Sequence, residues 1–437
     1  MKKNNSEKNN RGLVLTLIPT HAQKLLLDKH LNNTRFIYNK YVEEYLKAIK
    51  EDRIPNYKEY TELRTEYKFL EDSYSWALQM VLYKFTQTNK INRAKRSKGQ
   101  KVGLVRFRSK KAHNDHFCTK CLKLSYNSDC KSESYVRISK IGNVRFLCKN
   151  IKSELLNGKI KHGVVRRTKT GAYTISLCID VNKVHEERKD NKHVGLDFSL
   201  RDFFVGSFGA KAPGFSTKRS KMESLQKKID ILNNAISKMR NKSKKKRKVS
   251  VKVYRLTIKR NKLYERVHNI QKDYINKLSR DLCLHNELLV LEDLNLQNIA
   301  ERTSYKDSKT SSKGGNHGKS IGLLQWYYFC QKLEQNAEKF GNIIVYTDKY
   351  FPSSQICSKC GEIHPEMKDV TNRTLKCKCD NIIDRDYNSA LNLLKAGEEF
   401  LKRKTLGKDL SEYKAFRLKD YRAEHDNQMS ELELQLL

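Results

Sequence analysis

Alternating apolar and polar positions in the segment GLVLTLI, residues 12–18, predict a β-strand that ends at Pro19. Helical spacing follows, because the next apolar residues recur three and four apart: Tyr38, Val42, Tyr45 and Ile49. A second helix is predicted over Trp76 to Phe85, with Ser75 as its candidate cap. The pattern of the first hundred residues therefore predicts one strand followed by helices.

From about Lys101 to Asp180 the pattern is that of short strands. The segments are VGLVRFRS, SYVRIS, NVRFLC, KHGVVRRT and AYTISLCIDV, and the last two resemble a hairpin around Gly171. This order of one strand, a helical segment and then more strands predicts a small barrel with a helical domain inserted in it.

A different unit begins near Val194 with the strand HVGLDFSL, which a tight turn joins to a second strand, DFFVGSF. Two apolar stripes with coiled-coil spacing follow, from Met222 to Met239 and from Leu256 to Tyr274. They flank the cationic run KSKKKRK, residues 242–248. This order predicts an antiparallel helical hairpin whose positive tip contacts nucleic acid.

Strands and helices continue to alternate toward the C-terminus. ELLVLEDL, residues 287–294, has the pattern of a buried strand, and Glu301 to Ser320 that of a mobile loop. An amphipathic helix over about 323–340 and the strand NIIVYTD come next. A cysteine-containing segment then precedes the predicted helix DRDYNSALNLL.

The charge of the chain narrows its possible partners. Among 437 residues, 89 are Lys or Arg and 49 are Asp or Glu, a formal net charge of +40 that favours a polyanionic partner. No run approaches the roughly 18 apolar residues of a membrane span, and MKKNNSEKNN lacks a signal peptide's apolar stretch. We therefore expect a cytoplasmic protein that binds no membrane, whose paired cysteines are metal ligands.

Four acidic residues are candidates for a catalytic site. Asp197 lies in the first strand of the second unit, Glu292 ends a later buried strand, and Asp384 and Asp386 begin the last helix. An RNase H-like α/β sheet gathers carboxylates from such elements. The gathered carboxylates repel one another unless cations neutralise them, which two Mg²⁺ ions would do. Asp384 could instead serve only as a helix N-terminal residue facing the helix dipole.

Two cysteine pairs predict a structural zinc site. Cys357 and Cys360 form the knuckle CSKCG, and Cys377 and Cys379 form the shorter CKCD. If the short second turn cannot offer both sulfurs, His364 is a substitute ligand. The alternative is a reduced loop that holds no metal. A second group could also bind a metal, although its spacing is crowded: His113, His116, Cys118 and Cys121.

Together these motifs resemble the TnpB family, RNA-guided nucleases encoded by bacterial transposons. The matching motifs are IPTHAQKLLLDKHLNNTRFIYN, GLDFS, LEDLNL, FPSSQICSKCG and a cysteine pair followed by DRDYNSALNLL. The compact type V CRISPR effectors share the nuclease domain and are close relatives. The resemblance implies a guide RNA, a double-stranded DNA target cleaved beside a short adjacent motif, and a RuvC triad of Asp197, Glu292 and Asp386. It favours Asp386 over Asp384 as the metal ligand.

The resemblance also implies a domain organisation, with a RuvC nuclease of RNase H-like α/β fold at its centre. The expected parts are a wedge β-barrel (1–20 and 101–188), a helical recognition domain (21–100), the RuvC domain (189–350 and 381–397) and a zinc ribbon (351–380). A helical tail (398–437), which departs from the family pattern, is expected after them. The leading hypothesis is an RNA-guided DNA endonuclease that uses Mg²⁺ for hydrolysis and Zn²⁺ for structure. A type V CRISPR effector, a guide-directed repressor and a transposase or resolvase are the alternatives. The sequence leaves the oligomeric state open.

Overall fold

The computed structural model describes residues 8–110, 115–120, 122–127, 133–148, 150–182, 186–242, 250–294, 322–348, 351–405 and 414–417. The chain divides into two compact units, residues 1–183 and 184–437. Mixed α and β structure occurs in both. None of the helices in these ranges combines the length and apolar character needed to cross a membrane.

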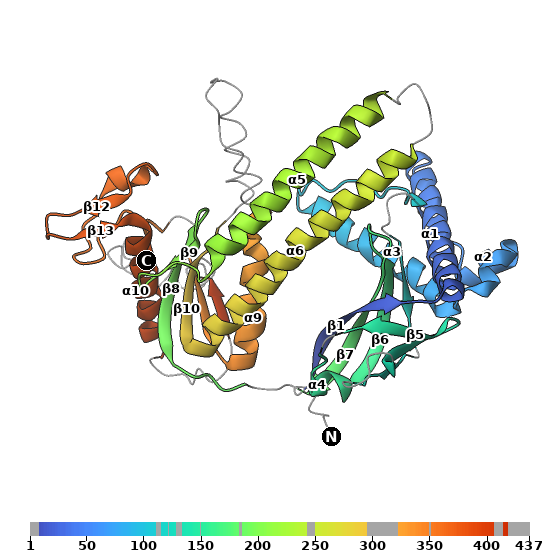
Figure 1. Cartoon of the computed structure of the whole chain (residues 1–437), viewed down its shortest axis with the longest axis horizontal. Coiled ribbons are helices and arrows are strands. Elements are labelled where there is room, and N and C mark those ends of the chain that lie inside the picture. The colour runs from blue at the N-terminus through green and yellow to red at the C-terminus, as the bar shows by residue number, and fades with distance from the viewer. Residues whose placement is uncertain are drawn as a thin grey trace. The chain divides into compact units, whose positions relative to one another are not determined.

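The N-terminal unit is built on a seven-stranded antiparallel sheet with the order β2-β6-β7-β1-β5-β4-β3 (Figure 1). The strands are β1 (Lys8–Ile18), β2 (His116–Thr119), β3 (Lys123–Ser125), β4 (Tyr135–Ile138), β5 (Gly142–Leu147), β6 (Lys159–Arg167) and β7 (Tyr173–Asn182). Strand β1 is central because it pairs with β7 along most of its length and with β5 at its end. The predicted strand before Pro19 is confirmed.

In the sequence, a group of helices separates β1 from the other six strands of this sheet. They are α1 (His21–Lys50), α2 (Tyr60–Glu66), the 3₁₀ helix η1 (Lys68–Asp72) and α3 (Ser75–Ser97), with the short α4 (Ser153–Leu156) following β5. Thr20 caps α1 through a reciprocal capping box with Gln23. The predicted cap of α3 was wrong, since Tyr74 is the N-cap and Ser75 is the first helical residue.

The predicted strand VGLVRFRS was also wrong. Its residues, 102–109, form no strand. The carbonyls of Val102 and Gly103 accept hydrogen bonds from Arg96 of α3. The backbone N–H and C=O of Arg108 bond to the Asn39 side chain at 2.8 and 3.0 Å, so an amide takes the place of a strand partner. The Arg108 guanidinium lies 3.6 Å from the ring centroid of Tyr38.

The C-terminal unit contains a five-stranded sheet with the order β14-β11-β10-β8-β9. Its strands are β8 (Lys192–Ser199), β9 (Phe203–Gly206), β10 (Asn286–Glu292), β11 (Ile343–Thr347) and β14 (Lys414–Arg417). Strands β8, β10, β11 and β14 are parallel, and only β9 runs antiparallel to its neighbour. The predicted strands of this unit are confirmed.

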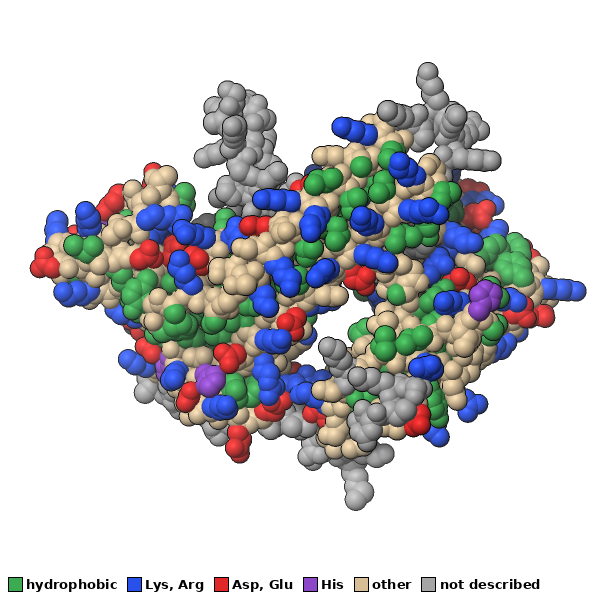
Figure 2. All heavy atoms as spheres, viewed as in Figure 1, with side chains coloured by type: hydrophobic (Ala, Val, Ile, Leu, Met, Phe, Trp, Pro, Cys, Tyr) green, Lys and Arg blue, Asp and Glu red, His purple; other side chains and the backbone are tan. Residues whose placement is uncertain are grey.

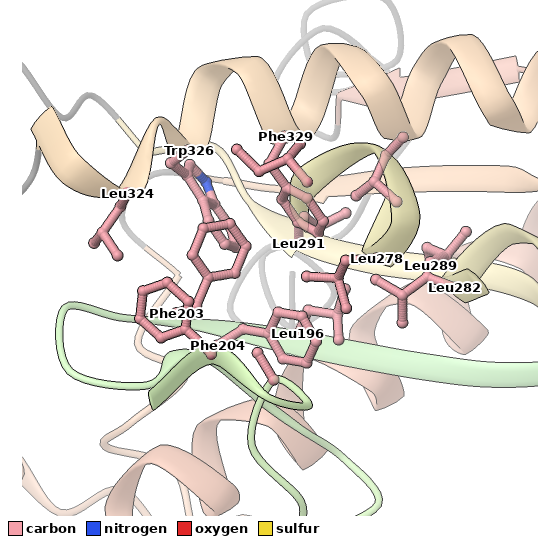
Figure 3. Packing of buried hydrophobic residues seen from close by; sticks show 14 of the residues in the cluster. Leu196, Phe203, Phe204, Leu278, Leu282, Leu289, Leu291, Leu324, Trp326 and Phe329 are labelled. Carbon is pink, nitrogen blue, oxygen red and sulfur yellow. The ribbon is translucent and has the colours of Figure 1, made fainter. Parts of the chain in front are cut away.

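Helices cover both faces of this sheet. Helices α5 (Phe215–Lys242), α6 (Val251–His285) and α9 (Trp326–Phe340) share the large hydrophobic core with one face. Helix α10 (Arg385–Thr405) packs on the other face, against β8, β10 and β11. Figure 3 shows Phe203 and Phe204 of β9 facing Trp326 and Phe329 of α9 within the large hydrophobic core that α5, α6 and α9 share with the sheet.

The predicted helical hairpin is formed by α5 and α6, which lie side by side (Figure 1). Its apolar stripes are buried at Met222, Ile229, Ile236 and Val267. The visible face of the hairpin carries many cationic side chains (Figure 2). Exposed ones are Lys218, Lys221, Lys227, Lys228, Lys238, Lys252, Arg255, Lys259, Lys262 and Arg266. Residues 243–248 of the predicted cationic tip lie outside the described residues, as does the predicted loop from Glu301 to Ser320.

The cysteine segment and the C-terminal tail complete this unit. The segment holds a 3₁₀ helix, η4 (Pro365–Lys368), and a small hairpin of β12 (Thr374–Lys376) and β13 (Ile382–Asp384). The predicted helical tail was wrong in part. Residues 398–405 belong to α10, whereas Lys414–Arg417 forms β14 and pairs with the otherwise open edge of β11. The remaining residues of 398–437 lie outside the described ranges.

Two glycines allow α10 to lie directly on the sheet. A Cβ atom at Gly195 of β8 would stand 2.1 Å from the carbonyl oxygen of Ala390 in α10. A Cβ atom at Gly397 of α10 would stand 2.3 Å from the Val290 side chain of β10. Both distances are far below van der Waals contact, so the helix can approach the strands this closely only because these side chains are absent.

We predict that Gly195→Ala destabilises the C-terminal unit by about 1–3 kcal/mol, since the helix backbone must move away from β8. Thermal unfolding of the full chain measures the effect. Gly103→Ala is the matched control, because a Cβ atom there would meet nothing within 4 Å. Equal melting temperatures for the two variants would contradict the close approach of α10.

Candidate functional site

Strand alternation directs Asp197 and Glu292 toward the face of the sheet that α10 covers. Leu196 of β8 is paired with Leu291 of β10, and both leucines are buried in the core on the opposite face. The next residues along the two parallel strands, Asp197 and Glu292, therefore point to the α10 side. Gly195, which α10 contacts, has the same orientation as Asp197.

Asp384, which ends β13, and Asp386, in the first turn of α10, have different roles. The Asp384 carboxylate accepts hydrogen bonds from the backbone N–H groups of Asp386 and Tyr387, at 3.0 and 3.1 Å. Asp384 is therefore occupied in capping the helix. Asp386, in the first turn, keeps its carboxylate 3.7 Å from Arg373.

Burial and mutual repulsion change the acidity of these carboxyl groups. Burial raises the pKa of Asp197 well above its usual range. A hydrogen bond from Ser389 opposes this rise, and the charges of Asp386 and Glu292 add to it. Burial raises the pKa of Glu292 to about 7. The pKa of Asp386 is raised by burial and by the charge of Asp384. Half-buried carboxylates that repel one another suit a hard divalent cation, which prefers oxygen ligands.

The oxygens of Asp197, Glu292 and Asp386 are not drawn into one tight cluster. Across the described ranges, three or more ligand atoms approach within 4.8 Å of one another only in two cysteine-containing groups. The three carboxylates come from β8, β10 and α10, which pack against one another.

The four predicted cysteines do form a tight cluster. The sulfurs of Cys357 and Cys379 are 3.7 Å apart, and those of Cys360 and Cys377 are 3.4 Å apart. A tetrahedral zinc ion with bonds of about 2.3 Å requires sulfur separations of about 3.8 Å. The shortened turn of the second pair therefore presents both sulfurs, and the cluster can hold a structural metal.

The surroundings of Cys357 favour a thiolate. Burial opposes ionisation there, but hydrogen bonds from Asn381 and from the backbone of Cys360 and Lys359 lower the pKa of Cys357 to about 6. His364, the substitute ligand, is buried and has Nδ1 3.0 Å from Glu366. It forms a second group of possible ligand atoms with Glu362 and Cys377.

A buried polar row on α10 connects this module to the sheet, and the sequence reasoning missed it. Asn388 binds the backbone at Ile356 and Ser358, and Asn392 binds the carbonyls of Ser353 and Ile356. Ser389 donates to Asp197 at 2.8 Å and lies 2.9 Å from the hydroxyl of Ser353. Polar residues three and four apart on an otherwise apolar helix face were the available signal.

The second predicted metal group is only partly described. His116 and Cys118 lie on β2, and both line a cavity of about 180 Å³ in the N-terminal unit. His113 and Cys121 lie outside the described residues. The described pair gives this group no further support.

Comparisons with known proteins agree with the motifs. Residues 326–393 match the family model described as "Cas12f1-like, TNB domain", residues 176–303 match "Probable transposase", and residues 9–53 match "Helix-turn-helix domain". In this chain the last region is strand β1 followed by the single helix α1.

Individual relatives match about a third of the chain. A "Putative RNA-guided DNA endonuclease" of Streptomyces pristinaespiralis is 29% identical over 136 residues, which are 31% of either chain. "TnpB-like protein L79" of Acanthamoeba polyphaga mimivirus is 30% identical over 138 residues, 31% of this chain and 24% of that protein. A solved structure, "Cryo-EM structure of the Cas12f1-sgRNA-target DNA complex", is 15% identical with a TM-score of 0.48, covering 88% of this chain and 98% of that one.

Fold and site thus define a mixed α/β protein that carries a four-cysteine cluster able to hold a metal. The resemblance of the chain to the TnpB family of transposon-associated proteins is confirmed by the family models and by relatives named TnpB-like.

The cysteine cluster predicts one tightly bound zinc ion per chain. Cys357→Ser should release it, because three thiolates and a hydroxyl hold zinc far less well than four thiolates. Elemental analysis of the purified chain measures the stoichiometry. Cys148→Ser, which changes a half-buried thiol of the other unit, is the control and should leave the zinc content unchanged. A wild-type chain without zinc would contradict the assignment.

Proposed function

We propose that this chain is an RNA-guided DNA endonuclease of the TnpB type, with Asp197, Glu292 and Asp386 as its catalytic carboxylates. The observation that carries the proposal is that α10 packs on paired strands β8 and β10. Asp197, Glu292 and Asp386 therefore all belong to elements at one face of the sheet. A polyanion-binding protein with a net charge of +40 gains nothing from carboxylates at that face unless cations bind them.

The strand order supports an RNase H-like identity for the C-terminal unit. Parallel strands β8 and β10 lie at its centre, with β9 antiparallel at one side. In this arrangement the carboxylates end neighbouring strands or begin the helix that packs on them. Domain boundaries of 189–350 and 381–397 for a RuvC domain, with 351–380 as an inserted zinc ribbon, are part of the same proposal.

The three carboxylates would hold two Mg²⁺ ions. The ions supply an activated water and charge stabilisation at the leaving 3′ oxygen of a phosphodiester. Asp197 and Glu292 contribute oxygens from rigid strands, and Asp386 contributes its own from the first turn of α10. Arg373, near Asp386, can bind a phosphate of the cleaved strand, since guanidinium and phosphate geometries match.

The remaining parts supply binding rather than hydrolysis. The exposed Lys and Arg side chains of the α5–α6 hairpin suit the phosphate backbone of a guide RNA or of its duplex with target DNA (Figure 2). Zinc at the four cysteines is structural, because four thiolates close the tetrahedron and leave no position for water. The N-terminal sheet is proposed as the wedge barrel (1–20 and 101–188), and α1–α3 belong to the helical domain (21–100).

Two other functions share much of this architecture. A compact type V CRISPR effector would use the same nuclease site and differs in the source of its guide. A guide-directed repressor would bind without cutting. Intact Asp197, Glu292 and Asp386 favour a nuclease over a repressor, since binding alone has no use for them.

Replacing Asp386 with Ala should reduce DNA cleavage by at least about a hundredfold while target binding persists, because hydrolysis needs the metal and binding needs mainly Lys and Arg. Cleavage assays with the purified ribonucleoprotein measure the rate. Asp384→Ala is the matched control and should cost only helix capping, about 1 kcal/mol of stability. The opposite result, an inactive Asp384 variant and a normal Asp386 variant, would reverse the assignment.

The chain should copurify with a structured RNA, and its RNA affinity should fall steeply as salt rises, because bound counterions are released when Lys and Arg meet phosphates. Sequencing of the bound RNA and filter binding at several salt concentrations measure both effects. Cleavage at a fixed DNA site by the RNA-free chain would contradict a guided mechanism.

A further inference from the structure

Two buried serines form a chain of hydroxyl groups that ends on the catalytic candidate Asp197. Ser389 Oγ lies 2.8 Å from Asp197 Oδ1 and 2.9 Å from Ser353 Oγ. Ser389 is 2% exposed and Ser353 is 6% exposed, so water does not compete strongly for these contacts. Ser389 stands one helical turn after Asp386 on α10, and Ser353 lies four residues before Cys357.

The chemistry of the groups fixes the direction of the chain when Asp197 is ionised. A carboxylate can only accept, so the single proton of Ser389 must be donated to Asp197. The Ser389 oxygen then accepts the proton of Ser353. The order of donation therefore runs from the loop before the cysteines, through α10, to the carboxylate on β8.

Asp197 needs such support because its neighbours repel it. The charges of Asp386 and Glu292 act on the Asp197 carboxylate, and before a metal binds they favour side-chain rotations that separate the three groups. A hydrogen bond to Oδ1 restricts rotation about the Cβ–Cγ bond and leaves the second oxygen available to a cation. Groups that orient metal ligands in this way commonly change metal affinity by tenfold or more.

We infer that Ser389 is a positioning residue, which holds Asp197 in a metal-binding orientation and is itself oriented by Ser353. This inference rests on the proposed function, because it assigns Asp197 to a metal. It adds a physical connection between the cysteine module and the nuclease site. The loop that carries Ser353 is fixed by Asn392, which binds its carbonyl at 2.8 Å, and it leads directly into the zinc knuckle.

The test compares Ser389→Ala, Ser353→Ala and the double variant with the wild-type chain. Each change removes one oxygen atom, so the fold should persist. Ser279→Ala is the matched control, because Ser279 is a fully buried helical serine of the same unit that bonds Asn336 rather than Asp197. Two readouts are needed: Mn²⁺ binding to the RNA-free full chain by electron paramagnetic resonance, and cleavage by the ribonucleoprotein as Mg²⁺ is varied.

Ser389→Ala should weaken Mn²⁺ binding and raise the half-saturating Mg²⁺ concentration by roughly tenfold. Saturating Mg²⁺ should restore most of the cleavage rate, because the lost group orients a ligand and touches no substrate. Ser353→Ala should have a smaller effect, roughly threefold, and the double variant should match Ser389→Ala, since Ser353 acts only through Ser389. The control should match the wild-type chain.

The outcomes separate this inference from the proposed function. Asp197→Ala identifies the Mn²⁺ that belongs to the carboxylate site. If the wild-type chain binds no Mn²⁺ that this variant loses, the metal site itself is wrong, and the inference fails with it. If that Mn²⁺ is present but Ser389→Ala binds it normally with an unchanged Mg²⁺ dependence, only the positioning role is overturned. Additive losses in the double variant would overturn the relay through Ser353.

Discussion

The close contact between α10 and the C-terminal sheet is the constraint on which the candidate site depends. A helix normally stands about 10 Å from a sheet because side chains separate them. Here Gly195 and Gly397 remove side chains from the interface, and backbone atoms approach directly. The first turn of α10 is thereby held over the ends of β8 and β10. Asp386 can then share a site with Asp197 and Glu292, although nearly two hundred residues separate the first from the last.

The same helix also holds the cysteine module. Its residues Asn388, Ser389 and Asn392 are buried and form hydrogen bonds with the loop that leads to Cys357. The module has a small apolar core of its own, in which Met367 and Leu375 pack with cysteines. A core of that size does not hold about thirty residues together, so the contacts with α10 must stabilise the module as well, and a metal held by the four cysteines would add to them. Disorder in the module would therefore also loosen the positions of Asp386 and Asp197, because α10 contacts both the module and the sheet.

Electrostatics divide the chain into a cationic surface and a shielded acidic centre. Exposed Lys and Arg side chains on the α5–α6 hairpin attract phosphates over a distance set by the Debye length. The carboxylates of Asp197, Glu292 and Asp386 would repel those phosphates if they stayed unneutralised. Burial raises the pKa of all three, and bound cations would turn this repulsion into attraction for a scissile phosphate. Under the proposed function, the opposite charges of surface and centre would serve one polyanionic substrate.

Local pattern in the sequence determined most of the elements and the candidate residues. Short apolar runs identified β8 and β10, helical spacing identified the α5–α6 hairpin, and the cysteine spacing identified the cluster that the fold brings together. These signals are local, since each depends on residues within a few positions of one another. Where a distant partner decided the conformation, local pattern failed: VGLVRFRS bonds to Asn39 of α1 instead of a strand, and 414–417 pairs with β11 instead of forming a helix.

Only the tertiary structure decided which polar groups meet. Asp384 and Asp386 are both aspartates and stand two residues apart, yet Asp384, the last residue of β13, caps α10, whereas Asp386 lies in the first turn of α10 near Arg373. The short CKC turn offers both sulfurs because the hairpin of β12 and β13 folds it toward Cys357 and Cys360. Ser389 gives no signal of its own in the sequence. Its hydroxyl bonds to Asp197 of β8 on one side and to Ser353 of the loop on the other. Only long-range packing brings these two groups within hydrogen-bond distance of Ser389.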